Sequence, residues 1–259
     1  AELGPDVSRS IKNIMKVIRF ISQNLFLIIS IFLIFFIPLY PKLPILDVKN
    51  TWVYIRIEDF LIAVVALIFF IQLLRRKVTL DTPLTMPIIL FWLAGGIATL
   101  HGIIFLFPNL PGVFPQIAFL YFLRHIEYLL LFFIGFAAIR DKKHITPIII
   151  AFAVTLLLVF LYGLGQRYLG FPAFLTMNEE FAKGIPLKLS ALSRVPSTFA
   201  GHYDLAAYLI LMIPFMGSMV FGYKKWWAKL FFFLTAVSGL ILLMMTASRV
   251  SFAVYLVSI

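Results

Sequence analysis

Seven long apolar runs restrict what this chain can fold into more than any other feature of its sequence. Each is about as long as the roughly 20 helical residues that cross the hydrocarbon core of a bilayer. None alternates between apolar and polar residues, and a backbone inside lipid must satisfy its own hydrogen bonds, so the runs predict helices and not a β-barrel. The chain is 63% hydrophobic, against roughly 45–50% in soluble domains. We therefore expect an all-α, polytopic integral membrane protein with spans at Phe20–Leu39, Ile57–Leu74, Pro87–Phe107, Ala118–Ile139, Ile145–Gly165, Tyr203–Gly222 and Leu230–Thr246.

An eighth apolar run, Val250–Ile259, follows Arg249. Ten residues of helix rise about 15 Å, which is about half of a hydrocarbon core. We expect this run to be a truncated eighth span. Residues 1–259 would then form a single transmembrane domain and the N-terminal part of a longer protein.

The net charge of +11 follows a topological pattern. If the chain crosses the membrane at every predicted span, thirteen of the 22 basic residues fall on one side. The positive-inside rule makes that side cytoplasmic and places the N-terminus there. The basic excess then reports orientation and contact with anionic membrane lipids, so no nucleic acid is expected as a partner. The thirteen are Arg9, Lys12, Lys16, Arg19, Arg75, Arg76, Lys77, Arg140, Lys142, Lys143, Lys224, Lys225 and Lys229.

The opposite, outer side is expected to carry mixed charge. It receives the long connection 166–202, which is apolar enough to pack on the membrane surface, and loops of that length are usually functional or disordered. Seven of the eleven acidic residues lie at or near this side: Asp47, Glu58, Asp59, Glu127, Glu179, Glu180 and Asp204. Since mixed titratable groups are what chemistry needs, we expect the functional surface on the outer side.

The stretch SRVPSTFAGHYDLAAYL, residues 193–209, places titratable groups at the mouth of an apolar helix. Asp204 suits a cap or a first-turn acid, and the same helix end offers free N–H groups to a phosphate. Arg194 lies eight residues upstream, beyond Pro196, so the loop can turn its guanidinium toward the same point, where it would bind phosphate bidentately. The alternative is an interfacial helix start with a capping Asp204, a membrane-belt Tyr203 and a snorkelling Arg194.

Two further clusters have a functional and a structural interpretation. In Arg124-His125-Ile126-Glu127-Tyr128, Arg124, Glu127 and Tyr128 share one helix face. Ionisable groups in a span mark a functional interior by default, although an Arg–Glu pair can also simply neutralise itself. Glu58 and Asp59 head the second span, where the helix dipole alone favours acids.

The chain offers little for a metal ion. It has no cysteine, which excludes disulfides and thiolate ligands. It also has no histidine pair at helical spacing and no Asp-x-Asp. We expect no metal and no other cofactor, so arginines would carry any phosphate chemistry.

Residues 194–209 resemble the arginine-then-STFGN-x-N-x-LAAYL pattern of the bacterial O-antigen ligase and polymerase superfamily. Thr246-Ala247-Ser248-Arg249 resembles the T-x-SR motif with which the family opens its next helix. Residues 53–60 and 124–128 also look like the early spans of that family. The similarity extends over most of the chain but is sharp only at 194–209 and 246–249, and His202-Tyr203-Asp204 stands where many members have Asn-Pro-Asn.

The resemblance implies a multi-span glycosyltransferase of the GT-C type in the bacterial inner membrane. Members transfer a glycan from undecaprenyl diphosphate to lipid A core or to another glycan, on the periplasmic face and without a metal. Arg194 and Arg249 match the family's diphosphate-binding arginines, and we expect Arg124 to assist them. We expect the two arginines to point into one outer-facing cavity, with Asp204 holding one of them.

A base must also take the proton of the acceptor hydroxyl. The candidates are Glu127, His202, Glu58 and Asp59; we expect Glu127 or His202 to be catalytic, with Glu58, Asp59, Asp204 and Tyr203 in support. A transporter or flippase of a lipid-linked glycan would use the same basic residues, but it would need polar residues through several spans. A non-catalytic membrane scaffold would explain the topology without the outer cluster.

Overall fold

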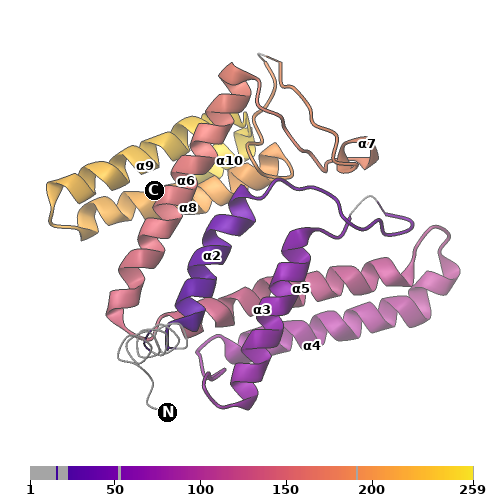
Figure 1. The fold of residues 1–259 in the computed structure, drawn as a ribbon. Coiled ribbons are helices and arrows are strands. Elements are labelled where there is room, and N and C mark those ends of the chain that lie inside the picture. The colour runs from indigo at the N-terminus through magenta and orange to yellow at the C-terminus, as the bar shows by residue number, and fades with distance from the viewer. Residues whose placement is uncertain (1–15, 17–22, 52–53, 191, 259) are drawn as a thin grey trace, which may run out of the picture. The chain divides into compact units, whose positions relative to one another are not determined.

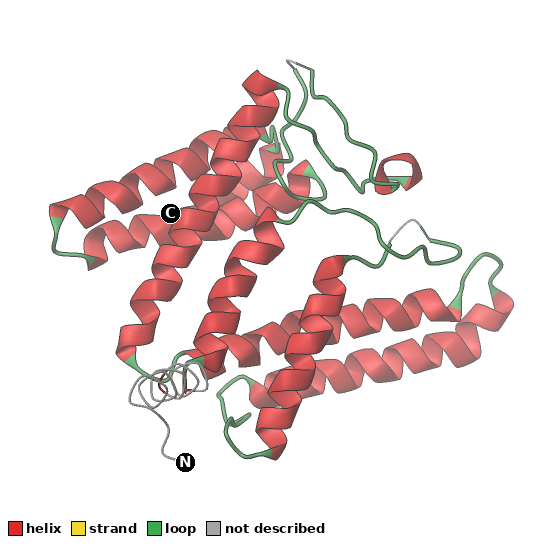
Figure 2. Cartoon of the chain, in the orientation of Figure 1, coloured by secondary structure: helices red, strands yellow, loops and turns green. Residues whose placement is uncertain are grey.

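The computed structural model describes residue 16 and residues 23–51, 54–190 and 192–258. Helices dominate this part of the chain, with two isolated antiparallel bridges, Leu46–Ile55 and Ala173–Leu187, and no strand (Figure 2). The expected all-α class is confirmed for the described residues. The α-helices are α2 (Leu25–Leu39), α3 (Ile57–Leu74), α4 (Thr85–His101), α5 (Pro115–Ala138), α6 (Ile145–Leu164), α7 (Glu179–Ala182), α8 (His202–Gly222), α9 (Trp226–Met245) and α10 (Arg249–Ser258).

Among the described residues, six helical segments are long and apolar enough to cross a membrane. They are Ile57–Leu74, Thr85–Asn109, Pro115–Ala138, Lys142–Leu169, His202–Gly222 and Trp226–Met245, which correspond to six of the seven predicted spans. The described part of the remaining span, Phe20–Leu39, is the 15-residue apolar helix α2. Phe20 and the basic residues Arg9, Lys12 and Arg19 lie outside the described residues. The composition of these helices indicates a membrane location.

The chain divides into two compact units. The first consists of Ala1–Leu33 and Ala63–Ile148, and the second of Ile34–Ile62 and Ile149–Ile259. Figure 1 follows the chain from indigo through magenta, in α4 and α5, to yellow in α9 and α10.

In the first unit, α4 and α5 pack along each other (Figure 1). Gly96 favours this approach, because a Cβ there would lie only 3.3 Å from the Phe122 ring. Beyond His101, α4 continues as a π-helix, Gly102–Leu106, and a 3-10 turn, Phe107–Asn109. The unit's most buried side chains include Phe69, Phe133 and Ile134.

The second unit has its core between α6, α8 and α9. Leu156, Leu205, Leu209 and Leu242 are fully buried there. Gly239 lets α9 approach α8, since a Cβ at this position would lie 3.0 Å from Cγ1 of Ile213. The close packing of small and branched side chains fixes the hairpin that brings the start of α8 and the end of α9 together.

Two prolines determine how α2 ends. A proline has no N–H, so the carbonyl four residues before it loses its helical donor. Pro38 leaves the carbonyl of Ile34 open, and the Thr155 hydroxyl of α6 donates to it at 3.3 Å. Pro41 likewise leaves the carbonyl of Ile37 open, and Nζ of Lys42 donates to it at 2.9 Å. The end of α2 is therefore fastened to α6, and Lys42 is drawn into the interior.

The predicted outer connection 166–202 is folded rather than structureless. Gln166 is almost fully buried, and its Nε2 donates to the carbonyls of Pro172 at 3.0 Å and Ser197 at 2.8 Å. The hydroxyl of Ser197 donates in turn to the carbonyl of Val159 in α6 at 2.7 Å. These bonds hold the two ends of the connection against the end of α6. Ala173, Ala182 and Val195 are buried in it, whereas larger apolar side chains such as Phe171 and Ile185 are exposed.

Candidate functional site

One backbone hydrogen bond brings the two motifs of the second unit together. The N–H of Val195 donates to the carbonyl of Met245, the last residue of α9, at 3.1 Å. Val195 is fully buried in the core of the unit. Arg194 is thereby held beside the turn that follows α9, although that turn lies about fifty residues further along the chain.

The turn presents Arg249 to the same place. Thr246 is fully buried and its hydroxyl donates to the carbonyl of Leu243 at 2.7 Å, which closes the end of α9. Ala247 then takes a left-handed conformation, with φ at +51°, and the chain reverses direction. Ser248 is buried, and α10 begins at Arg249.

A cavity of about 380 Å³ lies between these segments. Arg194 and Arg249 both line it, as expected from the sequence. Arg249 is exposed, and its side chain forms no hydrogen bond or ion pair with any other described residue. The full lining is Arg194, Tyr203, Ala247, Ser248, Arg249 and Val250, so it includes the first turns of both α8 and α10.

The guanidinium of Arg194 is oriented by two neutral acceptors. Its Nη1 lies 2.9 Å from Nε2 of His202 and 3.4 Å from the hydroxyl of Tyr203. A guanidinium can only donate, so Nε2 of His202 accepts and the imidazole is neutral in this arrangement. To act as a base at Nε2, His202 would first have to release Arg194.

Asp204 does not hold either arginine of the cavity. Gly201, and not Asp204, is the N-cap of α8, and Asp204 lies in the first helical turn. Within the described part of the chain Asp204 forms no ion pair with Arg194 or Arg249, and Arg194 contacts His202 and Tyr203 instead. The expectation that it holds Arg194 or Arg249 is therefore wrong, because the loop turns Arg194 toward His202 instead.

A buried ion network lies around Glu58, at the start of α3. Lys42 and Arg56 both pair with its carboxylate, with Nη1 of Arg56 at 3.1 Å. Burial lowers the pKa of the Lys42 amine below its ordinary value, and the nearby Glu58 carboxylate raises it part of the way back. Asp59 caps α3 by accepting from the N–H of Arg56 at 2.8 Å. Glu58 and Asp59 thus have structural partners, as the helix-start interpretation expects.

Lys42 is the residue of this network that sequence reasoning missed. It stands in a loop, where a lysine is ordinarily exposed, yet its side chain is only 8% exposed. The available signal was Pro41, which removes a helical donor from the carbonyl of Ile37 and leaves it open to the side chain of the next residue, Lys42.

The remaining predicted site residues lie in the first unit. Arg124 and Glu127 are half-buried on α5, and the ring nitrogen Nδ1 of His125 between them lies 2.7 Å from the carbonyl of Tyr121. The structure therefore assigns Arg124 and Glu127 to a different unit from the cavity of Arg194 and Arg249.

The described residues define an all-helical protein with six helices able to cross a membrane and a doubly basic cavity at one helix hairpin. Comparison of the chain with protein-family models, with curated proteins and with solved structures gave no match.

Proposed function

We propose that this protein is a membrane glycosyltransferase of the O-antigen ligase or polymerase type. It would transfer a glycan from undecaprenyl diphosphate to lipid A core or to a growing polysaccharide, at the periplasmic face of the bacterial inner membrane. The observation that carries the proposal is the pair of arginines, Arg194 and Arg249, lining one cavity.

The chemistry of the transfer calls for such a cavity. The acceptor oxygen forms a bond to the anomeric carbon as the bond from that carbon to the diphosphate oxygen breaks, and negative charge grows on the diphosphate. Fixed cations stabilise that charge most where they are already positioned and poorly hydrated. Arg194 and Arg249 supply two positive charges, and the starts of α8 and α10 add backbone N–H groups and helix dipoles.

The proton of the acceptor hydroxyl must pass to a base. His202 is the candidate in contact with the cavity, through Arg194. A diphosphate that draws the guanidinium of Arg194 toward itself would free Nε2 of His202, so donor binding and activation of the base would be linked. Glu127, on α5, stays a second candidate.

The buried polar residues of α6 and α9 speak against the transporter alternative. Thr155, Thr235 and Ser238 are buried within these helices. Each hydroxyl donates to a backbone carbonyl, those of Ile34, Phe231 and Thr235 respectively. They serve the helices themselves and do not form a polar path for a glycan.

The proposal is tested by replacing each arginine with lysine, which exchanges the planar guanidinium for a single ammonium group. Arg194→Lys and Arg249→Lys should each lower glycan transfer by about 10²-fold, because lysine cannot form the bidentate contact. The assay uses purified protein in liposomes with a glycan on undecaprenyl diphosphate and lipid A core as acceptor. Arg167→Lys is the matched control, since Arg167 donates to the carbonyl of Ser193 at 3.1 Å outside the cavity. Transfer at the parent rate by Arg194→Lys would refute the assignment.

A further inference from the structure

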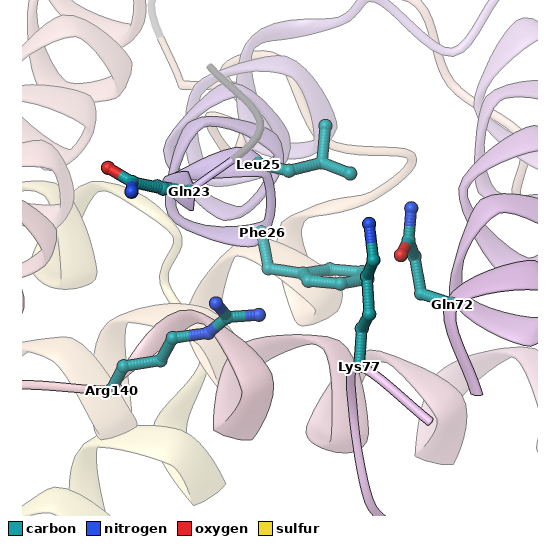
Figure 3. A pocket seen from close by; sticks show the side chains of 6 residues that line it. All are labelled: Gln23, Leu25, Phe26, Gln72, Lys77 and Arg140. Carbon is teal, nitrogen blue, oxygen red and sulfur yellow. The ribbon is translucent and has the colours of Figure 1, made fainter. Parts of the chain in front are cut away.

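A second cavity, of about 250 Å³, lies in the first unit (Figure 3). Three helix ends form it: the start of α2, the end of α3 with the turn after it, and the residues after α5. Since α3 and α5 are long and apolar enough to cross a membrane, their ends lie where hydrocarbon gives way to lipid headgroups. The lining residues are Gln23, Leu25, Phe26, Gln72, Lys77 and Arg140.

The polar side of this cavity is positively charged and not neutralised. Lys77 and Arg140 are its two cations, and neither side chain pairs with another residue in the described part of the chain. None of the described residues that line the cavity is acidic. Asp141, next to Arg140 in sequence, is engaged by Lys143 at 3.0 Å, and this contact lowers the pKa of the Asp141 carboxyl. The amides of Gln23 and Gln72 add neutral donors.

The other side of the cavity is apolar and well packed. Phe26 is only 3% exposed, and its ring packs edge-to-face against Phe69 with centroids 5.7 Å apart. Figure 3 shows the side chains of Lys77 and Arg140 extending toward Phe26 from different directions. The volume is far above the roughly 10–15 Å³ that holds one water molecule, so a group of the size of a lipid headgroup fits.

We propose that this cavity binds the phosphodiester headgroup of an anionic membrane lipid such as phosphatidylglycerol. The phosphate would lie between Lys77 and Arg140, with hydrogen bonds from the glutamine amides, and the acyl end would follow Leu25. A free phosphate shares the charge chemistry but has nothing to place on the apolar side. Basic pockets between helix ends at a membrane surface suit such headgroups.

The test compares the binding of an anionic lipid with the binding of free inorganic phosphate. Purified protein in detergent is titrated with dihexanoyl-phosphatidylglycerol and, separately, with dihexanoyl-phosphatidylcholine and inorganic phosphate, and bound species are resolved by native mass spectrometry. We expect saturable binding of the anionic lipid alone. The double variant Lys77→Gln, Arg140→Gln should raise its Kd by about twenty-fivefold, at roughly fivefold for each lost cation.

The matched control is Arg75→Gln, Lys142→Gln. It removes the same charge from residues that follow the same two spans but do not line the cavity, and its Kd should stay within about twofold of the parent. If the double variant does not fold, Arg140→Gln alone should raise the Kd about fivefold. Equal weakening in the control would overturn the site in favour of unspecific surface charge. Inorganic phosphate binding as tightly as the lipid would overturn the assignment of the ligand to a lipid.

Discussion

Lys42 links the start of α3 to the end of α2, because its amine pairs with Glu58 and donates to the carbonyl of Ile37. Its replacement should therefore destabilise the second unit. In Lys42→Met the stem of the side chain keeps its volume, but the amine is lost. Glu58 then loses one of its two cations, and the carbonyl of Ile37 loses its donor. The side chain of Glu58 is only 13% exposed, and Ile37 is half-buried.

The expected loss is about 3 kcal/mol in the free energy of unfolding. Breaking a buried ion pair from one side costs roughly 3–5 kcal/mol, and Glu58 lies at the lower end because Arg56 remains 3.1 Å away. An unpaired buried carbonyl costs roughly 1–3 kcal/mol. The two penalties overlap, since water reaching one group would also reach the other.

Unfolding is measured by titrating the protein with SDS in mixed micelles and following helical circular dichroism. Lys49→Met is the matched control, because Lys49 is an exposed lysine of the same loop and should change stability by less than about 0.5 kcal/mol. In the double variant Lys42→Met, Glu58→Gln the stranded carboxylate is gone, so the loss should be smaller than the sum of the single losses by about 1–2 kcal/mol. A loss below about 1 kcal/mol for Lys42→Met would mean that the pair contributes no more than an exposed one, and the reasoning would fail.

Two further predictions concern α6 and the orientation of the chain. Thr155→Val leaves the carbonyl of Ile34 without its donor and should lower the free energy of unfolding by about 1 kcal/mol. Thr235→Val should be close to neutral, because the carbonyl of Phe231 keeps its helical N–H donor. Equal effects of the two variants in the same SDS titration would contradict the role given to Thr155. Since the chain lacks cysteine, Lys143→Cys and Lys183→Cys place single labels on two exposed positions. An impermeant maleimide added to intact cells should react at 183 and not at 143, and reaction at both would refute the proposed orientation.

Hydropathy predicts the helices of this chain closely, because a backbone in lipid must form its own hydrogen bonds and a long apolar run is therefore helical. The predicted span Ile57–Leu74 has the bounds of α3, and both ends of α6 and of α8 lie within one residue of those of their predicted spans. α9 begins at Trp226, four residues before the predicted Leu230, because Lys229 lowers the hydropathy of a turn that is still helical. Residues 226–229 are helical, but the apolar run that hydropathy detects begins only after Lys229.

The conformations of the loops and of their side chains depend on contacts between residues far apart in the sequence, which a local sequence pattern does not reveal. The proximity of Arg194 and Arg249 could be predicted, since two consecutive spans return the chain to the same side. The partner of Arg194 could not be predicted, because it depends on the bond from Val195 to Met245 and on the buried amide of Gln166. Those contacts place the guanidinium against His202.

That difference in partner separates two kinds of cation in the second unit. Lys42 and Arg56 face the carboxylate of Glu58, so their charge is neutralised and serves the fold. Arg194 donates to a neutral imidazole and a phenol, and Arg249 has no partner in the described part of the chain. A carboxylate beside Arg194 would compete with any anion for the guanidinium, whereas His202 orients it and leaves its full charge available. We therefore propose that this cavity, with two such arginines, binds an anion with more than one charge, such as a diphosphate.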